Sequence, residues 1–415
     1  MPTLLRAFRH RTFRTFYGGQ FLSLVGSWMQ TVATSWLVYR LSGSALLLGI
    51  TTAAQQLPVL FVSPLAGVWA DRVNRRRMLI FIQSIACVQA LALTVLTFTE
   101  VIEVPHVIAL AMVLGVVTAF ETPTRQAFLL EMVEREDLPN AIALQSMLFQ
   151  SARFIGPSIA GLLLAAFGEA WCFLVNTISF LIIIATYSIL KTRPRPPAQT
   201  GTQWWHDLAS GFRYAFGFEG TRRLLLLLGA VGLFTAPWSS LMPIFAAETL
   251  HGNSRTLGFL IGAVGLGAMA GTAFLAVRSS VRGLGRVVCA ASITAGVALA
   301  LFSQSRALPV SLALLPFFGF GLVVTAASIN TILQTVADED KRARVISLYV
   351  MTFIGIAPIG NFVAGAAAER FGVHATLLVC GTIVAAAGIA FALRLRSWAR
   401  AVRPVYVKRG IIQER

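Results

Sequence analysis

The sequence predicts an all-α polytopic membrane protein with twelve transmembrane helices in two six-helix pseudo-repeats. Three observations predict this fold class: the composition, the spacing of apolar segments and an internal repeat. Of the 415 residues, 56% are hydrophobic and 12% are charged, and the mean hydropathy is +0.75. Soluble domains carry about twice that charged fraction. The length therefore fits about a dozen membrane spans with short loops better than two or three soluble domains.

Apolar segments of roughly the length of a membrane span recur along the whole chain, separated by Pro, Gly and charged clusters. They cover residues 16–39, 46–69, 78–99, 105–124, 142–166, 171–190, 224–247, 257–277, 287–304, 308–333, 346–367 and 374–393. The basic start of the chain leads into a long apolar stretch without a small-residue cleavage site. We therefore expect a retained first span rather than a signal peptide.

Lysine and arginine concentrate in alternate loops, and this bias sets the orientation. One side holds the N-terminal arginines, the cluster from Arg72 to Arg77 and the basic tail from Arg394 onward. The other side has only four basic residues, which are Arg40, Arg255, Arg306 and Arg370. Both termini are thus predicted to be cytoplasmic, as an even number of spans requires. The expected location is a bacterial cytoplasmic (inner) membrane.

The net charge of +17 lies at segment ends and not on a soluble module, so the expected partner is the lipid bilayer and not nucleic acid. The four cysteines are scattered through apolar segments without a CxxC pair, which favours neither a metal site nor a disulfide framework. A phosphate-binding loop, an HExxH motif and a nucleophile–base cluster are all missing from the sequence. We therefore expect no enzyme, no cofactor and no metal.

The two halves of the chain are related. Residues 126–168 and 330–372 align without gaps at an offset of 204, which pairs Gly156 with Gly360. At an offset of 210, Trp28 pairs with Trp238. Both copies run in the same direction, and parallel repeats that meet at a midplane site are a transporter architecture. Because one chain contains both halves, we expect a functional monomer.

These patterns predict four parts of the chain. An N-terminal six-helix bundle covers 1–190, a cytoplasmic linker 191–223, a C-terminal bundle 224–396 and a basic cytoplasmic tail 397–415. Within the linker, Trp204, Trp205, Leu208, Phe212 and Phe216 follow helical spacing. This pattern predicts an amphipathic helix that either lies on the inner leaflet or packs on the cytoplasmic face of the bundle.

A short turn between the second and third segments, GVWADRVNRRR at 67–77, combines a glycine, one acid and four arginines. The pattern G-x-x-x-D-R-x-x-R-R between spans two and three resembles the signature loop, motif A, of the major facilitator superfamily. Residues 123–144 with GPSIAG at 156–161 are similar to the branch that contains the enterobactin exporter and macrolide efflux pumps. The first resemblance covers nearly the whole chain.

The resemblance implies a gating role for this turn. Its residues are Gly67, Asp71, Arg72, Arg75 and Arg76. Asp71 would stabilise the outward-open state by a charge contact with the other half, while Arg72 and Arg76 would bond nearby carbonyls and acids. The alternative is that Asp71 merely caps span three and the arginines only set the orientation.

Span five contains a second motif, Gly156, Pro157 and Gly161, which resembles motif C of the superfamily's exporters. It departs from the family pattern in its last pair, Ala-Gly in place of Gly-Gly. The alternative is ordinary close packing, since glycine lets helices approach and proline bends a span. In span four, Ala111 stands where many drug antiporters have an arginine four residues before a glycine, here Gly115.

Polar stripes mark candidate substrate-cavity residues on spans one, seven and ten. These residues are Gln20, Ser23, Ser27, Gln30, Thr34, Trp238, Thr325, Ser328 and Asn330. A polar stripe that faces lipid is costly, so each stripe faces either a cavity or another helix. The resemblance implies that spans one, four, seven and ten line the cavity. Trp238 could stack a substrate or pack in the core.

Charges inside the spans are few, and each is a candidate for function. Glu121 in span four and Arg153 in span five are the candidate coupling residues, with Glu121 paired to Arg153 or Arg125. A helix-surface pair of Glu121 with Arg125 is the alternative. The predicted function is a secondary active transporter, a proton-coupled exporter of a siderophore-like or drug-like compound. The alternative is an importer of a small metabolite with the same fold.

Overall fold

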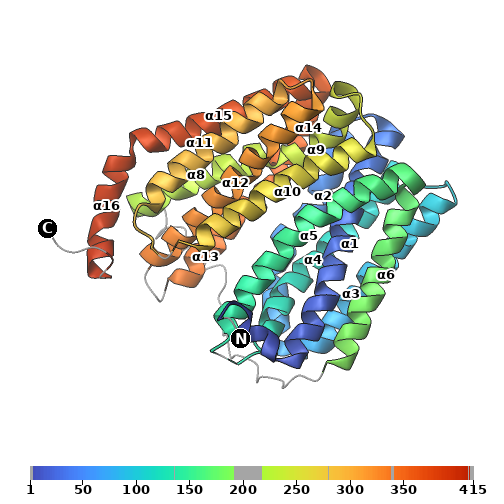
Figure 1. Ribbon diagram of the computed structural model, residues 1–415, viewed down its shortest axis with the longest axis horizontal. Helices are drawn as coiled ribbons and strands as arrows, with labels where there is room; N and C mark the ends of the chain where they lie inside the picture. The colour runs from blue at the N-terminus through green and yellow to red at the C-terminus, as the bar shows by residue number, and fades with distance from the viewer. Residues whose placement is uncertain are drawn as a thin grey trace. The chain divides into compact units, whose positions relative to one another are not determined.

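The computed structural model describes residues 3–134, 136–190, 217–278, 280–337, 341–409 and 411, and all regular secondary structure in these ranges is helical (Figure 1). A short 3₁₀ helix, η1 (Thr3–Arg9), precedes the first long helix. The helices of the first half are α1 (Arg11–Ser42), α2 (Ala45–Arg72), α3 (Arg75–Phe98), α4 (Val104–Leu129), α5 (Leu138–Phe167) and α6 (Glu169–Ile189). Each matches one of the first six predicted segments, and α3 and α6 end one residue before the predicted ends at 99 and 190.

The second half contains the remaining six segments. Its helices are α8 (Glu219–Thr235), α9 (Pro237–Ile244), α10 (Ser254–Ala276), α11 (Leu284–Ser303), α12 (Leu308–Val336), α13 (Arg342–Val350), α14 (Ala357–Phe371), α15 (Val373–Leu393) and α16 (Leu395–Lys408). Two π-helical turns, η2 (Phe245–Thr249) and η3 (Met351–Gly355), join α9 to the loop before α10 and α13 to α14.

Two predicted continuous spans, 224–247 and 346–367, are interrupted in the structure. The first divides into α8, α9 and η2, and the second into α13, η3 and α14. Prolines account for two of these breaks, because Pro237 begins α9 and Pro358 lies in the first turn of α14. Proline lacks the N–H of the helical ladder and clashes with the preceding turn. Hydropathy alone does not reveal such breaks.

Eleven helical stretches of the described chain are long and apolar enough to cross a membrane. Helix α1 is not among them, although its 32 residues would suffice in length. The Gln, Ser and Thr residues of its polar stripe lower its mean hydropathy. Eleven spans thus follow from length and composition, and the twelfth stays a prediction.

The chain divides into two compact units. The first contains Met1–Thr200 and Met242–Gly262, and the second contains Gly201–Leu241 and Ala263–Arg415. The predicted boundary differs, because it assigned residues 242–262 to the C-terminal bundle. The predicted linker helix around residues 204–216 lies outside the described residues.

Each unit is built on close helix pairs. In the first unit α1 packs on α5 and α6, α3 on α6, and α2 on α4. Its core near the start of α1 and the ends of α4 and α6 is aromatic and includes Phe13, Phe16, Phe128 and Tyr187, all at most 1% exposed. In the second unit α11 packs on α12 and α15, as Figure 1 shows in orange and red. Both units therefore bury apolar side chains against helices of the same unit.

The predicted basic tail is in large part a helix, α16. Its indole Trp398 is 4% exposed, donates from Nε1 to the carbonyl of Gly220 at 3.0 Å and packs edge-on against Phe391. Val402 is also buried, against Gly220 of α8. The tail is therefore docked on its own unit through one apolar face, while Arg396 and Arg400 are exposed.

Candidate functional site

The turn between α2 and α3 is shorter than predicted. Helix α2 runs to Arg72, and Asn74 is the N-cap of α3, its Oδ1 accepting from the Arg77 amide at 3.1 Å. The alternative in which Asp71 caps span three is therefore wrong. Asp71 belongs to the last turn of α2, where the helix dipole disfavours an acid. The side chains of Asp71 and Arg72 lie outside the described ones, as do the surroundings of Gly67.

Arg75 and Arg76 tie this turn to two other helices of the first unit. Arg75 Nη1 lies 2.8 Å from Glu131 Oε1, just after α4, and both side chains are nearly buried. Arg76 Nε donates to the Tyr187 carbonyl at 2.7 Å, and its Nη2 donates to the Ser188 carbonyl. The carbonyls at the end of a helix lack intrahelical partners, so a guanidinium satisfies them well. Arg76 thus makes carbonyl contacts of the kind that the resemblance implied for it, whereas the acid contact belongs to Arg75, for which it implied none.

The motif in α5 contacts a different helix on each side. A Cβ atom at Gly156 would lie 2.6 Å from Trp28 Cβ of α1. A Cβ atom at Gly161 would lie 2.9 Å from Gly258 Cα of α10, and one at Gly258 would lie 2.6 Å from the Pro157 carbonyl oxygen. Real Cβ atoms essentially never approach so closely. Glycine is thus required at these positions for α5 to lie against α1 and the first part of α10.

The polar stripe of α1 divides between two environments. Gln20 and Gln30 are at most 2% exposed, and both bond to other helices. Gln20 accepts from Tyr187 Oη at 3.2 Å. Gln30 donates to Gln89 Oε1 at 3.0 Å and accepts from Asn176 Nδ2 at 2.7 Å. For these two glutamines, the geometry is that of the second alternative, in which the polar side chain bonds to another helix.

The rest of the stripe is less uniform. Ser23 is buried, Ser27 and Thr34 are half-buried, and Thr31 is exposed. The Ser27 and Thr31 hydroxyls donate to carbonyls of their own helix, at 2.9 and 3.0 Å. Ser27, Thr31 and Thr34 share one side of α1 by helical spacing. This side is the part of the stripe that a ligand could reach.

The candidates in the second unit are largely enclosed. Trp238 is 6% exposed and packs edge-on against Phe318, with ring centroids 5.7 Å apart. Thr325 and Ser328 are fully buried, and neither hydroxyl has a hydrogen-bond partner among the described residues. Asn330 is half-buried and accepts from Gln334 at 3.1 Å. Trp238, Thr325 and Ser328 therefore do not line an open cavity in this structure.

The two intramembrane charges are separate from each other. Glu121 Oε1 lies 3.6 Å from Arg125 Nε, one turn along α4, which is the geometry of the helix-surface alternative. The Arg153 guanidinium carbon lies 5.6 Å from the centre of the Trp28 ring. Glu121 therefore has a partner on its own helix, and Arg153 contacts an aromatic ring of α1.

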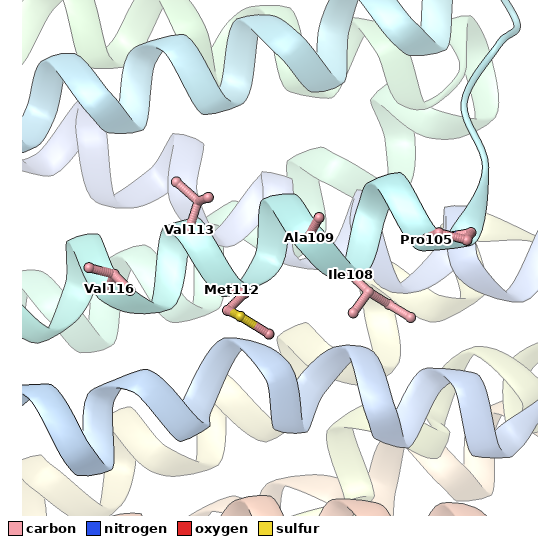
Figure 2. Close-up of a pocket in the computed structure, with 6 residues that line it drawn as sticks. All are labelled: Pro105, Ile108, Ala109, Met112, Val113 and Val116. Carbon is pink, nitrogen blue, oxygen red and sulfur yellow. The ribbon is translucent and has the colours of Figure 1, made fainter.

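An apolar groove of about 560 Å³ runs along α4 (Figure 2). One face of that helix lines it, with Pro105, Ile108, Ala109, Met112, Val113 and Val116. Ala111, at the position where many antiporters have arginine, is instead buried in the unit. Helix α4 thus presents no charge along this groove.

An ion cluster that the sequence analysis missed joins the N-terminus to the start of α5. The Asp137 side chain is fully enclosed and lies 3.4 Å from Arg6, 2.7 Å from Arg9 and 2.9 Å from His10. The hydrogen bond from His10, supported by the Arg9 and Arg6 charges, lowers the pKa of Asp137 against the opposing effect of burial. The sequence features that could have predicted this cluster are the acidic residues within 134–137 and the arginines near the N-terminus.

Taken together, the apolar helices and their contacts define a polytopic helical membrane protein with two compact units. The family described as transmembrane secretion effector, a major facilitator family, matches residues 3–406, and the chain belongs to it. This membership indicates a transporter rather than an enzyme.

Relatives with assigned names are transporters too. The chain is 27% identical to the multidrug efflux pump Tap of Mycolicibacterium fortuitum, over 91% of this chain and 95% of that protein. It is 26% identical to the staphyloferrin A transporter of Staphylococcus aureus, over 63% of this chain and 66% of that protein. Macrolide efflux protein A of Streptococcus pyogenes is 24% identical, over 61% of this chain and 66% of that protein. These names agree with the siderophore and macrolide branch indicated by the sequence.

Solved structures share the fold. The nucleoside transporter NupG has a TM-score of 0.71 at 15% identity, over 92% of this chain and 99% of that one. A transporter of the POT family has a TM-score of 0.72 at 11% identity, over 94% and 97%. At such identities the likeness concerns the fold alone.

Proposed function

We propose that the protein is a secondary active transporter that works by alternating access and exports a siderophore-like or drug-like organic compound in exchange for protons. The packing of α5 is the observation that carries this proposal. Gly156 and Gly161 hold α5 against α1 and against the first part of α10. Relatives named for multidrug and macrolide efflux support export as the direction.

In this proposal Gly67, Asp71, Arg72, Arg75 and Arg76 control the conformational change. The contacts of Arg75 and Arg76 with Glu131 and the end of α6 support a rigid turn. A rigid turn would transmit a charge contact of Asp71 to helices α4 and α6. Glu121 is proposed as the proton carrier, because it lies inside the span Val104–Leu129, whereas Glu169 lies at the very start of Glu169–Ile189. Arg125 is its partner on the same helix.

The direct test is transport in proteoliposomes with an imposed pH gradient. Radiolabelled erythromycin and ethidium serve as probes of macrolide and multidrug transport. Proton exchange predicts that uptake into inside-acidic vesicles, with the cytoplasmic face outward, stops when the gradient is collapsed. Indifference to the gradient would remove the antiport claim. Accumulation of a nutrient in whole cells that is lost on deletion of the gene would favour an importer.

A further inference from the structure

Arg153 is a cation near the middle of a membrane span. It lies in α5, within the span Asn140–Phe167, about halfway along. Among the described side chains no carboxylate forms an ion pair with it, whereas Arg125 of the neighbouring α4 pairs with Glu121. Its contact is the ring of Trp28, 5.6 Å from the guanidinium carbon. Charged residues at this depth mark substrate or ion pathways.

The helical position of Arg153 directs it toward protein and not toward lipid. Gly156, three residues later, faces α1, and Pro157, four residues later, faces the first part of α10. Residues three and four apart share one side of a helix. Arg153 therefore lies between these two contacts, and its side chain is only half-buried. Part of its side chain therefore stays accessible.

The free-energy cost of removing the Arg153 guanidinium from water favours the binding of an anion beside it. Removing a guanidinium from water costs several kcal/mol unless it is paired. A cation–π contact with an aromatic ring offsets only about 2 kcal/mol of this cost. Arginine can still donate through the edge of its planar group, in the two parallel bonds that suit a carboxylate. A bound anion would thus supply the compensation that the described residues do not.

Aromatic surface adjoins this cation. Phe149, one turn before Arg153, is 40% exposed and meets the Trp28 ring edge-on at 5.9 Å. Thr31, one turn after Trp28 on α1, adds an exposed hydroxyl. Gly156 makes this arrangement possible, because any Cβ there would displace Trp28. Gly156 therefore allows the Trp28 ring to lie next to the Arg153 guanidinium.

We propose that Arg153, Trp28 and Phe149 form the binding seat for an anionic group attached to an aromatic ring of the transported compound. This inference rests on the proposed function as a transporter and adds the substrate class. It assigns Arg153 to substrate binding and not to proton transfer. The carboxylate would bond the guanidinium edge while its ring packs against Phe149 and Trp28.

Binding to the purified full-length protein in nanodiscs tests this proposal without transport. The probes are 1-naphthoate and its uncharged match, 1-naphthamide, with Kd measured by isothermal titration. The wild type is expected to bind the acid at least about tenfold more tightly, the factor of one charge-assisted hydrogen bond. Arg153→Gln should bring the two Kd values to within about twofold, and Arg153→Lys should keep part of the preference. Arg306→Gln, at an exposed loop arginine, removes the same charge and should keep the full preference.

A fluorescence measurement guards against a misfolded variant. Trp28→Phe keeps an aromatic ring, so naphthoate should bind while the quenching contributed by Trp28 disappears. Equal affinity of the wild type for acid and amide, or an acid preference that survives Arg153→Gln, would overturn the seat. Proton-driven erythromycin transport by a protein without acid preference would refute this inference alone. A protein that binds naphthoate through Arg153 but ignores the pH gradient would refute only the proton exchange.

Discussion

Gly156 and Gly360, 204 positions apart, perform the same task in their separate units. A Cβ atom at Gly156 would lie 2.9 Å from the Val25 carbonyl oxygen of α1, and one at Gly360 would lie 2.2 Å from the Leu233 carbonyl oxygen of α8. In each unit the glycine lets one helix approach the backbone of the unit's first long helix. The internal repeat of the sequence therefore corresponds to a repeated packing contact.

Replacing either glycine should destabilise its unit. Gly156→Ala and Gly360→Ala each insert a methyl group where no space exists, and overpacking costs about 1–3 kcal/mol. We expect a lower thermal unfolding midpoint in detergent for both. Gly18→Ala is the matched control, because a Cβ there meets nothing within 4 Å. A control as damaging as Gly156→Ala would contradict the packing argument.

Substitutions in α1 should separate structure from transport. Gln30→Leu removes the hydrogen-bond partner of the buried Gln89 Oε1 and Asn176 Nδ2 atoms, at a cost of about 1–3 kcal/mol. Thr34→Val removes a half-buried hydroxyl without a recorded interhelical bond. We expect chemical denaturation to show a loss only for Gln30→Leu. Transport assays should show an altered substrate preference for Thr34→Val. An unchanged preference would show that Thr34 does not line the substrate cavity.

The pH dependence of the N-terminal anchor follows from Asp137. Its folded pKa is lowered, so its stabilisation is complete above the unfolded value of about 4 and is lost as pH falls through the folded value. Hydrogen exchange of the Ala7 amide, which donates to Asn140, should stay slow from pH 7 to about 5 after correction for intrinsic rates. Protection should decline only below about pH 4.

Asp137→Asn should loosen the same segment at neutral pH, because Arg6 and Arg9 lose their enclosed partner. Faster tryptic cleavage after Arg6 or Arg9 would report it. Glu134→Gln is the control, since this carboxylate is largely exposed and, within the described part of the chain, pairs only with Arg9. Equal cleavage of the two variants would show that enclosure of Asp137 does not anchor the N-terminus.

Asp71→Asn should reduce turnover by about tenfold or more without unfolding the protein, if the acid stabilises one conformation by a charge contact worth about 1.4 kcal/mol. The comparison is Glu100→Gln, an exposed acid in the loop after α3. Initial transport rates at saturating erythromycin measure the effect. Similar rates for the two variants would leave the turn without a gating role.

Docking of α16 can be tested through its indole. Trp398→Ala removes a buried ring and its hydrogen bond to Gly220, and such truncations cost about 3–5 kcal/mol. We expect early proteolysis of the C-terminal helix and a lower unfolding midpoint. Arg400→Ala, on the exposed side of the same helix, should resemble the wild type.

The sequence by itself determined the helical spans, their repeat and the family, because apolar runs and short motifs act locally. It located the glycines of α5 and the basic cluster after span two, but not the length of the turn, because α2 continues to Arg72. It could not distinguish a cavity from an interhelical bond for Gln30, since both place a polar side chain away from lipid. The partner Asn176 lies 146 positions away.

Only the tertiary structure decided which partners these residues meet. It showed that Asn74 and not Asp71 caps α3, that proline interrupts two spans, and that α16 docks through Trp398. It also showed that Arg153 lies over Trp28, whereas Glu121 stays with Arg125. Charge and polarity determine that a buried group needs a partner, but packing between distant segments determines which partner it has.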